Sequence, residues 1–335
     1  MITDNLQKTK QDAQTAQEPA VMIYEITDPG AASEDIEILD QDVVHLGTKP
    51  FSARRVVVNL DKSMFVFHST SHRTRSRTRV HPAMMALLIV GPMSRATIDG
   101  LDVDSNVLVA GEPGVDAEIV VEDGYESIAL MIPPDELMQH LRRRGREGTF
   151  NMPRGIEMWH SSQAELNELF EIGNRLAETA TNEPELLNNH GDVRAAAHNE
   201  LLEAYLAALQ TLEYTEPSRA DQTSQRYSRV VKMAQAHVME QQGSGYSVTD
   251  ICEATNTSQR TLQYAFRKIL GMTPIEYLIR LRLHRAHQDL RLANPETSNV
   301  SRIAVNWGFW HFGEFSNAYK TCFGELPSET LNRRL

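Results

Sequence analysis

The last hundred residues of this chain carry one residue pattern twice, at a constant offset of 53 positions. Apolar positions, a glycine, a proline and one basic position all recur. The pairs are Ile251 with Ala304, Ala254 with Trp307, Leu262 with Phe315, Phe266 with Tyr319, Arg267 with Lys320, Gly271 with Gly324, and Pro274 with Pro327. The repeat predicts two helix–turn–helix units in one small domain, a layout that would let one chain reach two turns of DNA.

Helix-boundary signals outline the first unit. Ser247 followed three residues later by Asp250 is typical of a capping box, which opens a short helix. Thr257 or Ser258 then caps a second helix, and Gly271 is placed to end it. These local signals predict the boundaries without any knowledge of the tertiary fold.

The outward face of that second helix holds only side chains that can donate hydrogen bonds to bases or phosphates. They are Gln259, Arg260, Gln263, Tyr264, Arg267 and Lys268. A solvated helix usually mixes the signs of its charges, whereas a helix that enters a phosphate-lined groove needs a face without carboxylates. The composition of this face predicts a helix that binds DNA.

A long helix is expected between the two units. Thr273 and Glu276 form a capping box with Pro274 at the first helical position, and the apolar spacing continues to about Leu292. Roughly 18 residues rise about 27 Å, whereas one turn of B-DNA is about 34 Å. Allowing for helix width, the two units could enter successive major grooves.

The second unit opens near Ser298 or Asn299, and its second helix covers about residues 311–323. The outward positions there are Phe312, Gly313, Ser316, Asn317 and Lys320, with Glu314 among them. This face is less basic than the first, so we expect weaker base discrimination or reading by shape and by thymine methyl groups. Gly313 has no side chain with which to read a base edge.

These motifs resemble the DNA-binding domain of AraC/XylS-family transcription regulators, over about residues 227–332. The resemblance is found in residues 258–274 and in the Trp-Gly-Phe-Trp-His and Gly-Glu-Leu-Pro-Ser runs of 307–328. These two runs are similar to those of the XylS and ethanolamine-operon activators. The resemblance implies activation through contact with RNA polymerase and binding to promoter DNA. Base contacts are implied at Arg260, Gln263, Tyr264, Phe312, Gly313, Ser316 and Asn317.

The charge is divided unevenly along the 335 residues. The net charge is −12, but residues 227–335 balance to +4 and residues 1–226 to −16. The repeated segment is therefore the basic one, as phosphate attraction requires. Two cysteines, Cys252 and Cys322, give no disulfide framework, and no signal-peptide or membrane-span pattern is present, so a cytoplasmic protein is expected.

Residues 21–155 show many short apolar runs separated by turn signals, which favours a small barrel or sandwich. The family resemblance implies a cupin-like β-barrel that binds an effector or dimerises. Two apolar stripes of helical period in 156–212 indicate a helix pair, which either packs on the β domain or forms a homodimer interface. With 1–20 as a disordered tail, 213–226 as a linker and 227–335 as the DNA-binding domain, the expected class is α+β.

Arg73, Arg75, Arg77 and Arg79 alternate with small polar residues. On a strand, period two would place all four on one face, where an anion would relieve their repulsion. The other interpretation is a solvated hairpin neutralised by the acidic surface of this domain. With Arg95 and Thr97 the segment loosely resembles the cyclic di-GMP-binding pattern of PilZ domains. Cyclic di-GMP or another anionic small molecule is therefore the expected effector, and no cofactor is expected.

Other classes of protein explain the sequence less well. An enzyme built on a true cupin would need a metal triad, but His45, His68, His72 and His81 lack that spacing, so we expect no metal and no catalysis. An architectural DNA-binding protein would not need so long an acidic N-terminal region. A redox switch between the cysteines is a weaker interpretation than two small buried residues.

Overall fold

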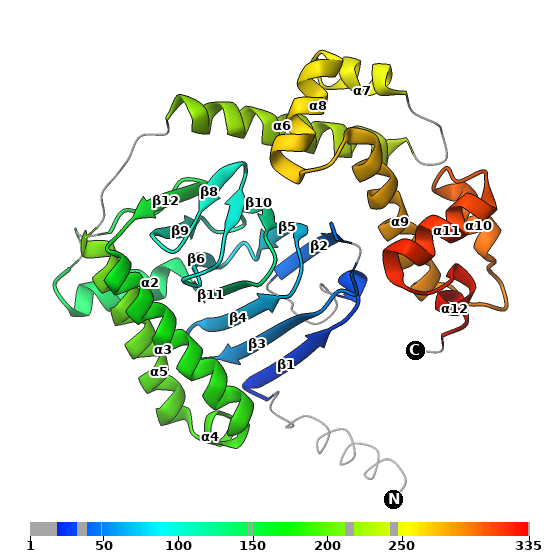
Figure 1. Ribbon diagram of the computed structural model, residues 1–335. Coiled ribbons are helices and arrows are strands. Elements are labelled where there is room, and N and C mark those ends of the chain that lie inside the picture. The colour runs from blue at the N-terminus through cyan, green and yellow to red at the C-terminus, as the bar shows by residue number, and fades with distance from the viewer. Residues whose placement is uncertain are drawn as a thin grey trace, which may run out of the picture.

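The computed structural model describes residues 19–31, 39–47, 49–146, 148, 150–211, 218–241 and 247–333. Figure 1 shows an N-terminal β-sheet domain with helices against it and a C-terminal helical domain, so the fold is α+β as predicted. The expected tail lies almost wholly outside the described residues. Among those residues, none of the helices is both long and apolar enough for a membrane span.

The strands form two antiparallel sheets. The seven-stranded sheet runs in the order β1 (Val21–Ile26), β3 (Ala53–Asn59), β4 (Met64–Thr70), β11 (Tyr125–Ile132), β6 (Met85–Val90), β9 (Val107–Gly111) and β12 (Ile156–His160). The five-stranded sheet runs in the order β2 (Leu39–His45), β5 (Thr74–Val80), β10 (Asp116–Val121), β7 (Ala96–Ile98) and β8 (Leu101–Val103). The described strands form a sandwich, one of the two architectures that the short apolar runs favour. The expected barrel is not closed, because no described strand pair joins the two sheets, and the likeness to a cupin stays a prediction.

Period-two alternation gives each sheet an inner and an outer face. On the seven-stranded sheet, the outer side chains Val56, Phe65 and Ile128 are fully buried against helices. Those helices are α2 (Pro134–Arg143), α3 (Gln163–Asn182), α4 (Pro184–Asn189) and α5 (Gly191–Ala208), and the short turns η1 (Pro29–Ala31) and η2 (Leu209–Thr211) complete the domain. The packing interpretation of the helix pair is thus confirmed, while its use in a dimer stays a prediction.

The C-terminal domain consists of α6 (Arg219–Glu240), α7 (Val248–Ala254), α8 (Gln259–Leu270), α9 (Pro274–Leu292), α10 (Val300–Asn306), α11 (Phe312–Phe323) and α12 (Pro327–Asn332). Helix α6 begins inside the expected linker, because Ser218 and Asp221 form a capping box that the sequence reading missed. The two cysteines are free and half-buried rather than fully buried.

The five-stranded sheet also has a covered outer face. Val44, Leu46 and Val120 are buried in one apolar cluster with α6, α8 and α9. Figure 1 shows α6 lying across the top of the sandwich and α9 descending beside β2. The sheet domain and the helical domain therefore share a core instead of being joined only by a linker.

Candidate nucleic-acid interface and interior cavity

Helix α8 has the boundaries that its cap residues predict. The Ser258 side chain accepts a hydrogen bond from the Thr261 backbone N–H at 3.2 Å. Gly271 ends the helix with φ of +68°, a left-handed conformation that glycine adopts without a Cβ clash. Leu262 and Phe266 are fully buried, so the opposite face must point outward.

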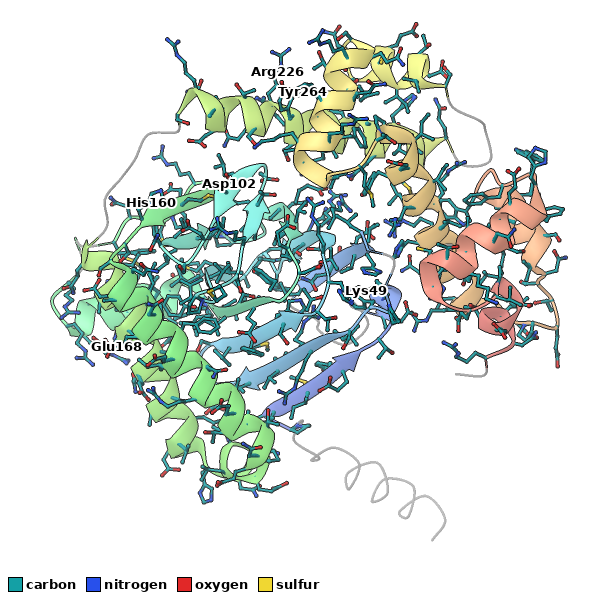
Figure 2. All side chains as sticks on the ribbon, in the orientation of Figure 1. Lys49, Asp102, His160, Glu168, Arg226 and Tyr264 are labelled. Atoms are coloured by element: carbon teal, nitrogen blue, oxygen red, sulfur yellow. The ribbon has the colours of Figure 1, made fainter. Side chains whose placement is uncertain are left out.

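That outward face is exposed among the residues that the structure describes. The six expected residues, Gln259, Arg260, Gln263, Tyr264, Arg267 and Lys268, are all exposed. Tyr264 is 62% exposed, and Figure 2 shows it on the side of the helical domain that faces away from the sheets. Its ring lies 6.3 Å from that of Tyr227 on α6, a neighbour the sequence did not indicate. The face carries two arginines and a lysine and no carboxylate, as a groove-binding helix requires.

Helix α11 presents the second expected DNA-contacting face, which is less basic than the face of α8. Phe312, Asn317 and Lys320 are exposed and Ser316 is half-buried, while Phe315 and Tyr319 hold the helix in its core. Just before the helix, the side chain of Trp310 is 62% exposed. In the sequence, Trp310 stands out only as part of the Trp-Gly-Phe-Trp-His run, although its exposed indole, two residues before Phe312, adds a second apolar group that could meet thymine methyls.

Helix α9 connects the two helix–turn–helix units and packs in the core of each. Thr273 and Glu276 form the expected capping box with Pro274 at the first position. Over its 19 residues the helix rises about 28 Å. Tyr277 and Leu278 are buried with the first unit, whereas Leu283 and Leu290 are buried with the second. Because both cores share this helix, neither unit can turn freely relative to it.

Arg75, Arg77 and Arg79 lie on strand β5 and alternate as period two predicts, and Arg73 lies just before the strand. Each one meets carboxylates of this chain. Arg75 is 3% exposed and is paired with Glu118 and, at 3.5 Å, with Asp42. The remaining pairs are Arg73 with Glu122 at 3.0 Å, Arg77 with Asp116, and Arg79 with Asp116 at 3.3 Å.

The two other residues expected at the effector site lie around the same sheet. Arg95 is exposed before β7, and Thr97 is half-buried on the outer face of that strand. Thr97 and Arg75 line one crevice under α6, with a volume of only about 10 Å³. This is room for one water molecule at most. The conformation described here therefore has no space for a cyclic dinucleotide beside Arg75.

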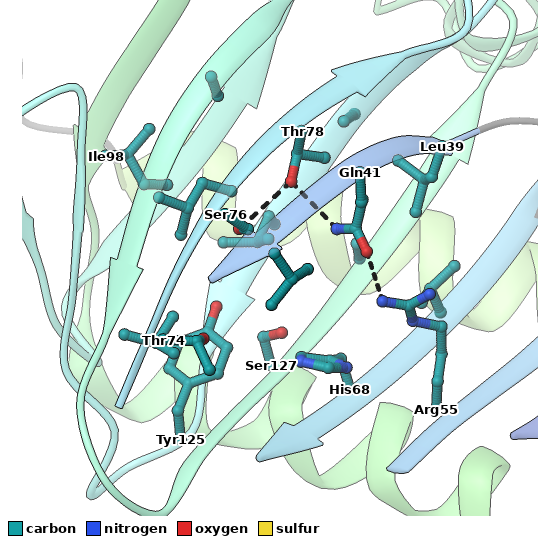
Figure 3. Close-up of a pocket in the computed structure, with 18 of the residues that line it drawn as sticks. Leu39, Gln41, Arg55, His68, Thr74, Ser76, Thr78, Ile98, Tyr125 and Ser127 are labelled. Carbon is teal, nitrogen blue, oxygen red and sulfur yellow. Dashed lines mark hydrogen bonds between the residues drawn. The ribbon is translucent and has the colours of Figure 1, made fainter. Parts of the chain in front are cut away.

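A larger cavity, of about 130 Å³, lies between the two sheets. Apolar side chains make up most of its wall, and Figure 3 shows the polar ones, among them Arg55, Gln41 and His68. This site could not be predicted from the sequence, because a gap between two sheets depends on long-range packing. One sequence signal is Arg55, which together with Arg54 precedes the apolar run 56–58 of β3. Among the described residues, no group of His, Cys, Asp or Glu is arranged to hold a metal ion.

Residues 251–333 match the family model described as a helix-turn-helix domain. The chain is 35% identical over 102 residues to the probable thc operon regulatory protein of Rhodococcus erythropolis, covering 30% of this chain and 31% of the relative. It is 32% identical over 108 residues to the XylDLEGF operon transcriptional activator 3 of Pseudomonas putida, covering 32% of this chain and 31% of that protein. The matched part is thus about a third of these curated relatives.

Among solved structures, the AraC-like transcriptional activator CuxR is similar at 14% identity, over 84% of this chain and 91% of that chain, with a TM-score of 0.33. The residues matched by the family model, 251–333, span both helix–turn–helix units and α9. The caps, core and exposed faces of this segment are those that the repeat predicts. The C-terminal domain of this chain belongs to the AraC/XylS family of helix–turn–helix domains.

Proposed function

We propose that the chain is a sequence-specific DNA-binding regulator of transcription, and an activator, controlled by a small molecule bound to its N-terminal domain. The observation that carries the proposal is the exposed face of α8, which holds only hydrogen-bond donors and no carboxylate. Arg260 and Gln263 suit base edges in the major groove, and Arg267 and Lys268 suit phosphates. The operon regulators among its relatives support the same role.

The two reading faces differ, so we propose an asymmetric target. Helix α8 offers arginines and amides, whereas α11 offers Phe312, Asn317 and one lysine. Each unit would then prefer a different short sequence, about one helical turn apart. The family resemblance further supports contact with RNA polymerase at a promoter in the cytoplasm, and a homodimer that would occupy two such sites in tandem.

Control by a small molecule is supported by the sandwich, which holds a cavity and shares a core with the DNA-binding domain. The expected anion site on Arg73, Arg75, Arg77, Arg79, Arg95 and Thr97 stays a prediction. Arg73, Arg75, Arg77 and Arg79 already pair with carboxylates of this chain, and this favours a structural role for these arginines. An anion that bound them would have to displace Glu122, Glu118 or Asp116. We propose that the chain acts by binding DNA and not as an enzyme.

In vitro selection from random duplex DNA tests the proposal directly. The full-length chain should enrich one asymmetric sequence with two conserved blocks about 10 base pairs apart. Its affinity should fall steeply with salt, since phosphate contacts release counterions. Enrichment of no sequence, with equal affinity for all duplexes, would contradict a sequence-specific regulator.

A further inference from the structure

Helix α6 extends past the first helix–turn–helix unit on one side. Its C-terminal part packs behind α8, where Val230 and Phe266 are buried in one apolar cluster. Ser218 caps the helix, so α6 begins at Arg219, roughly 16 Å before Val230 at 1.5 Å per residue. Figure 1 shows this first half of α6 on the side of α8 that is away from α10, α11 and α12.

One stripe of α6 carries exposed residues up to the edge of α8. The positions at i, i+4, i+7 and i+11, the spacing of one helix face, are Arg219, Thr223, Arg226 and Val230. Val230 is buried with α8, whereas the three residues before it are exposed. The stripe therefore lies on the side of α6 that α8 occupies. Arg226, about one turn before Val230, is its first exposed residue beyond α8.

The next residue, Tyr227, contacts α8. Its ring lies 6.3 Å from the ring of Tyr264, within the usual range of an aromatic pair. Tyr227 is half-buried, whereas Tyr264 is 62% exposed on the outward face of α8. Figure 2 shows Arg226 and Tyr264 at the same outer edge of the helical domain. The expected DNA-contacting face of α8 is therefore continuous with the exposed stripe of α6.

The charge of this half of α6 suits an anionic partner. Arg219, Arg226 and Arg229 are all exposed, and none of them forms an ion pair with another residue that the structure describes. The one carboxylate of residues 219–232 belongs to Asp221, and the capping box of the helix engages it. The arginines of residues 73–79, by contrast, all meet carboxylates of this chain. The positive charge of α6 is thus left for a partner outside the chain.

The sheet domain holds this half of α6 in place. Gly100, in the turn between β7 and β8, approaches the helix so closely that a Cβ there would lie 2.6 Å from the Ser224 carbonyl oxygen and 2.9 Å from the Ser228 Cβ. Each of these serines is two residues from Arg226, which places it on the opposite face of the helix. Arg226 therefore projects outward from a backbone that is packed on its other side, and binding orders little more than its side chain.

We propose that α6 is a second DNA-contacting element, in which Arg226 binds a backbone phosphate beside the major groove that α8 enters and Tyr227 positions Tyr264. This inference rests on the proposed function and extends its DNA-binding surface. Arginine suits a phosphate because its planar guanidinium donates two parallel hydrogen bonds. The phosphate lies outside the DNA block read by α8, on the side away from the α11 block, because the first half of α6 extends that way (Figure 1).

Removing the charge of Arg226 tests the phosphate contact. Arg226→Gln in the full-length chain should weaken binding to the selected duplex and to an unrelated duplex by a similar factor, about threefold, and reduce the slope of log K against log salt by about 1. Arg142→Gln is the matched control, because it removes an exposed arginine of α2, which packs on the other sheet. This control should keep the native slope. A native slope in Arg226→Gln, or an equal decrease in both variants, overturns the proposal.

Neutral methylphosphonates locate the contact on the DNA. Each phosphate within one helical turn outside the α8 block is replaced singly, and the native chain is compared with Arg226→Gln. At one or two positions the native chain should bind about threefold more weakly. The variant should show no further loss there, since its contact is already absent. Equal losses in both proteins at every position, or a difference confined to phosphates between the two blocks, contradict the placement.

The positioning role of Tyr227 is tested by a set of substitutions. Tyr227→Ala should relax the base preference at one position of the α8 block and keep the native salt slope, because it frees the Tyr264 ring without removing a charge. Tyr227→Leu, which fills the space without a ring, should behave in the same way. Tyr227→Phe keeps the ring pair and should match the native chain in both measurements. Native base preference in both Tyr227→Ala and Tyr227→Leu contradicts the positioning role.

The same measurements separate the α6 contact from the proposed function. A chain that selects one sequence, but whose salt slope Arg226→Gln leaves unchanged, keeps the proposed function and lacks the α6 contact. Equal affinity of the native chain for all duplexes counts instead against a sequence-specific regulator. In that case the salt slope of Arg226→Gln on any duplex still decides the phosphate contact, since phosphates are the same in every sequence.

Discussion

Arg75 of the sheet domain and Gln235 of helix α6 are joined by a hydrogen bond of 2.6 Å across 160 positions of sequence. Both side chains are buried, and the bond joins the sheet domain to the helical domain. The alternation of arginines in 73–79 correctly predicts that Arg75 shares an outer face with Arg77 and Arg79. The partners on that face are Glu118, Asp116 and Gln235 of the same chain, which agrees with the interpretation that acidic groups of this domain neutralise the arginines. The alternative, a bound anion, stays a prediction.

Replacing Arg260 tests the base-reading role of α8. Arg260→Ala should cost about 1–3 kcal/mol in binding to the selected sequence and should relax the preference at one base pair. The side chain is exposed, so the fold should be unaffected. Binding to a panel of duplexes that vary one position at a time measures both effects. An unchanged preference at every position would remove Arg260 from the set of reading residues.

Lys320 should behave differently, since we expect it to contact phosphate. Lys320→Ala should weaken binding to all sequences by a similar factor and reduce the slope of log K against log salt by about 1. The measurement is a salt series on the selected duplex and on an unrelated one. A loss confined to the selected duplex would indicate base reading instead.

A glycine at the edge of the interface offers a test of the contact between the sheet and α6. Gly100 has φ of +84°, and a Cβ there would lie 2.6 Å from the Ser224 carbonyl oxygen of α6. Gly124 has φ of +73°, with no described heavy atom within 4 Å of a Cβ. Both alanine variants should lose about 1 kcal/mol from backbone strain. Only Gly100→Ala should also displace α6.

Hydrogen exchange of α6 separates these two glycine variants. Gly100→Ala should speed exchange in the first half of the helix, and Gly124→Ala should leave it at the native rate. Equal exchange in the two variants would mean that α6 is not held against β8 through this contact.

His68 gives a prediction about pH. Its folded pKa of about 3 lies below the ordinary value of 6.5, so the unfolded chain takes up a proton between these values and the folded chain does not. This contribution to stability is complete above pH 6.5 and falls as the pH decreases, by about 2 kcal/mol at pH 5. Denaturant unfolding of His68→Gln should show a smaller loss between pH 7 and pH 5. His160→Gln, on an exposed side chain, is the matched control, and an equal loss in both variants would contradict the assignment.

Local signals explain why the helical half could be predicted in detail. Ser258, Gly271 and Thr273 set helix ends by bonds within a few residues, so the sequence alone places them correctly. The sheets depend on pairing between distant strands, and the same alternation is compatible with a closed barrel or a sandwich. The cavity and the partners of Arg75 lay beyond prediction for the same reason, since Glu118 and Gln235 are 43 and 160 positions away.

If the two units on α9 occupy successive major grooves of one duplex, a hydroxyl-radical footprint of the full-length chain on its selected sequence will show it. We expect two protected windows on one face of the DNA, about 10 base pairs apart. Arg260→Ala should weaken the window that contains the α8 block. A single protected window, or two windows on opposite faces of the duplex, would contradict this arrangement.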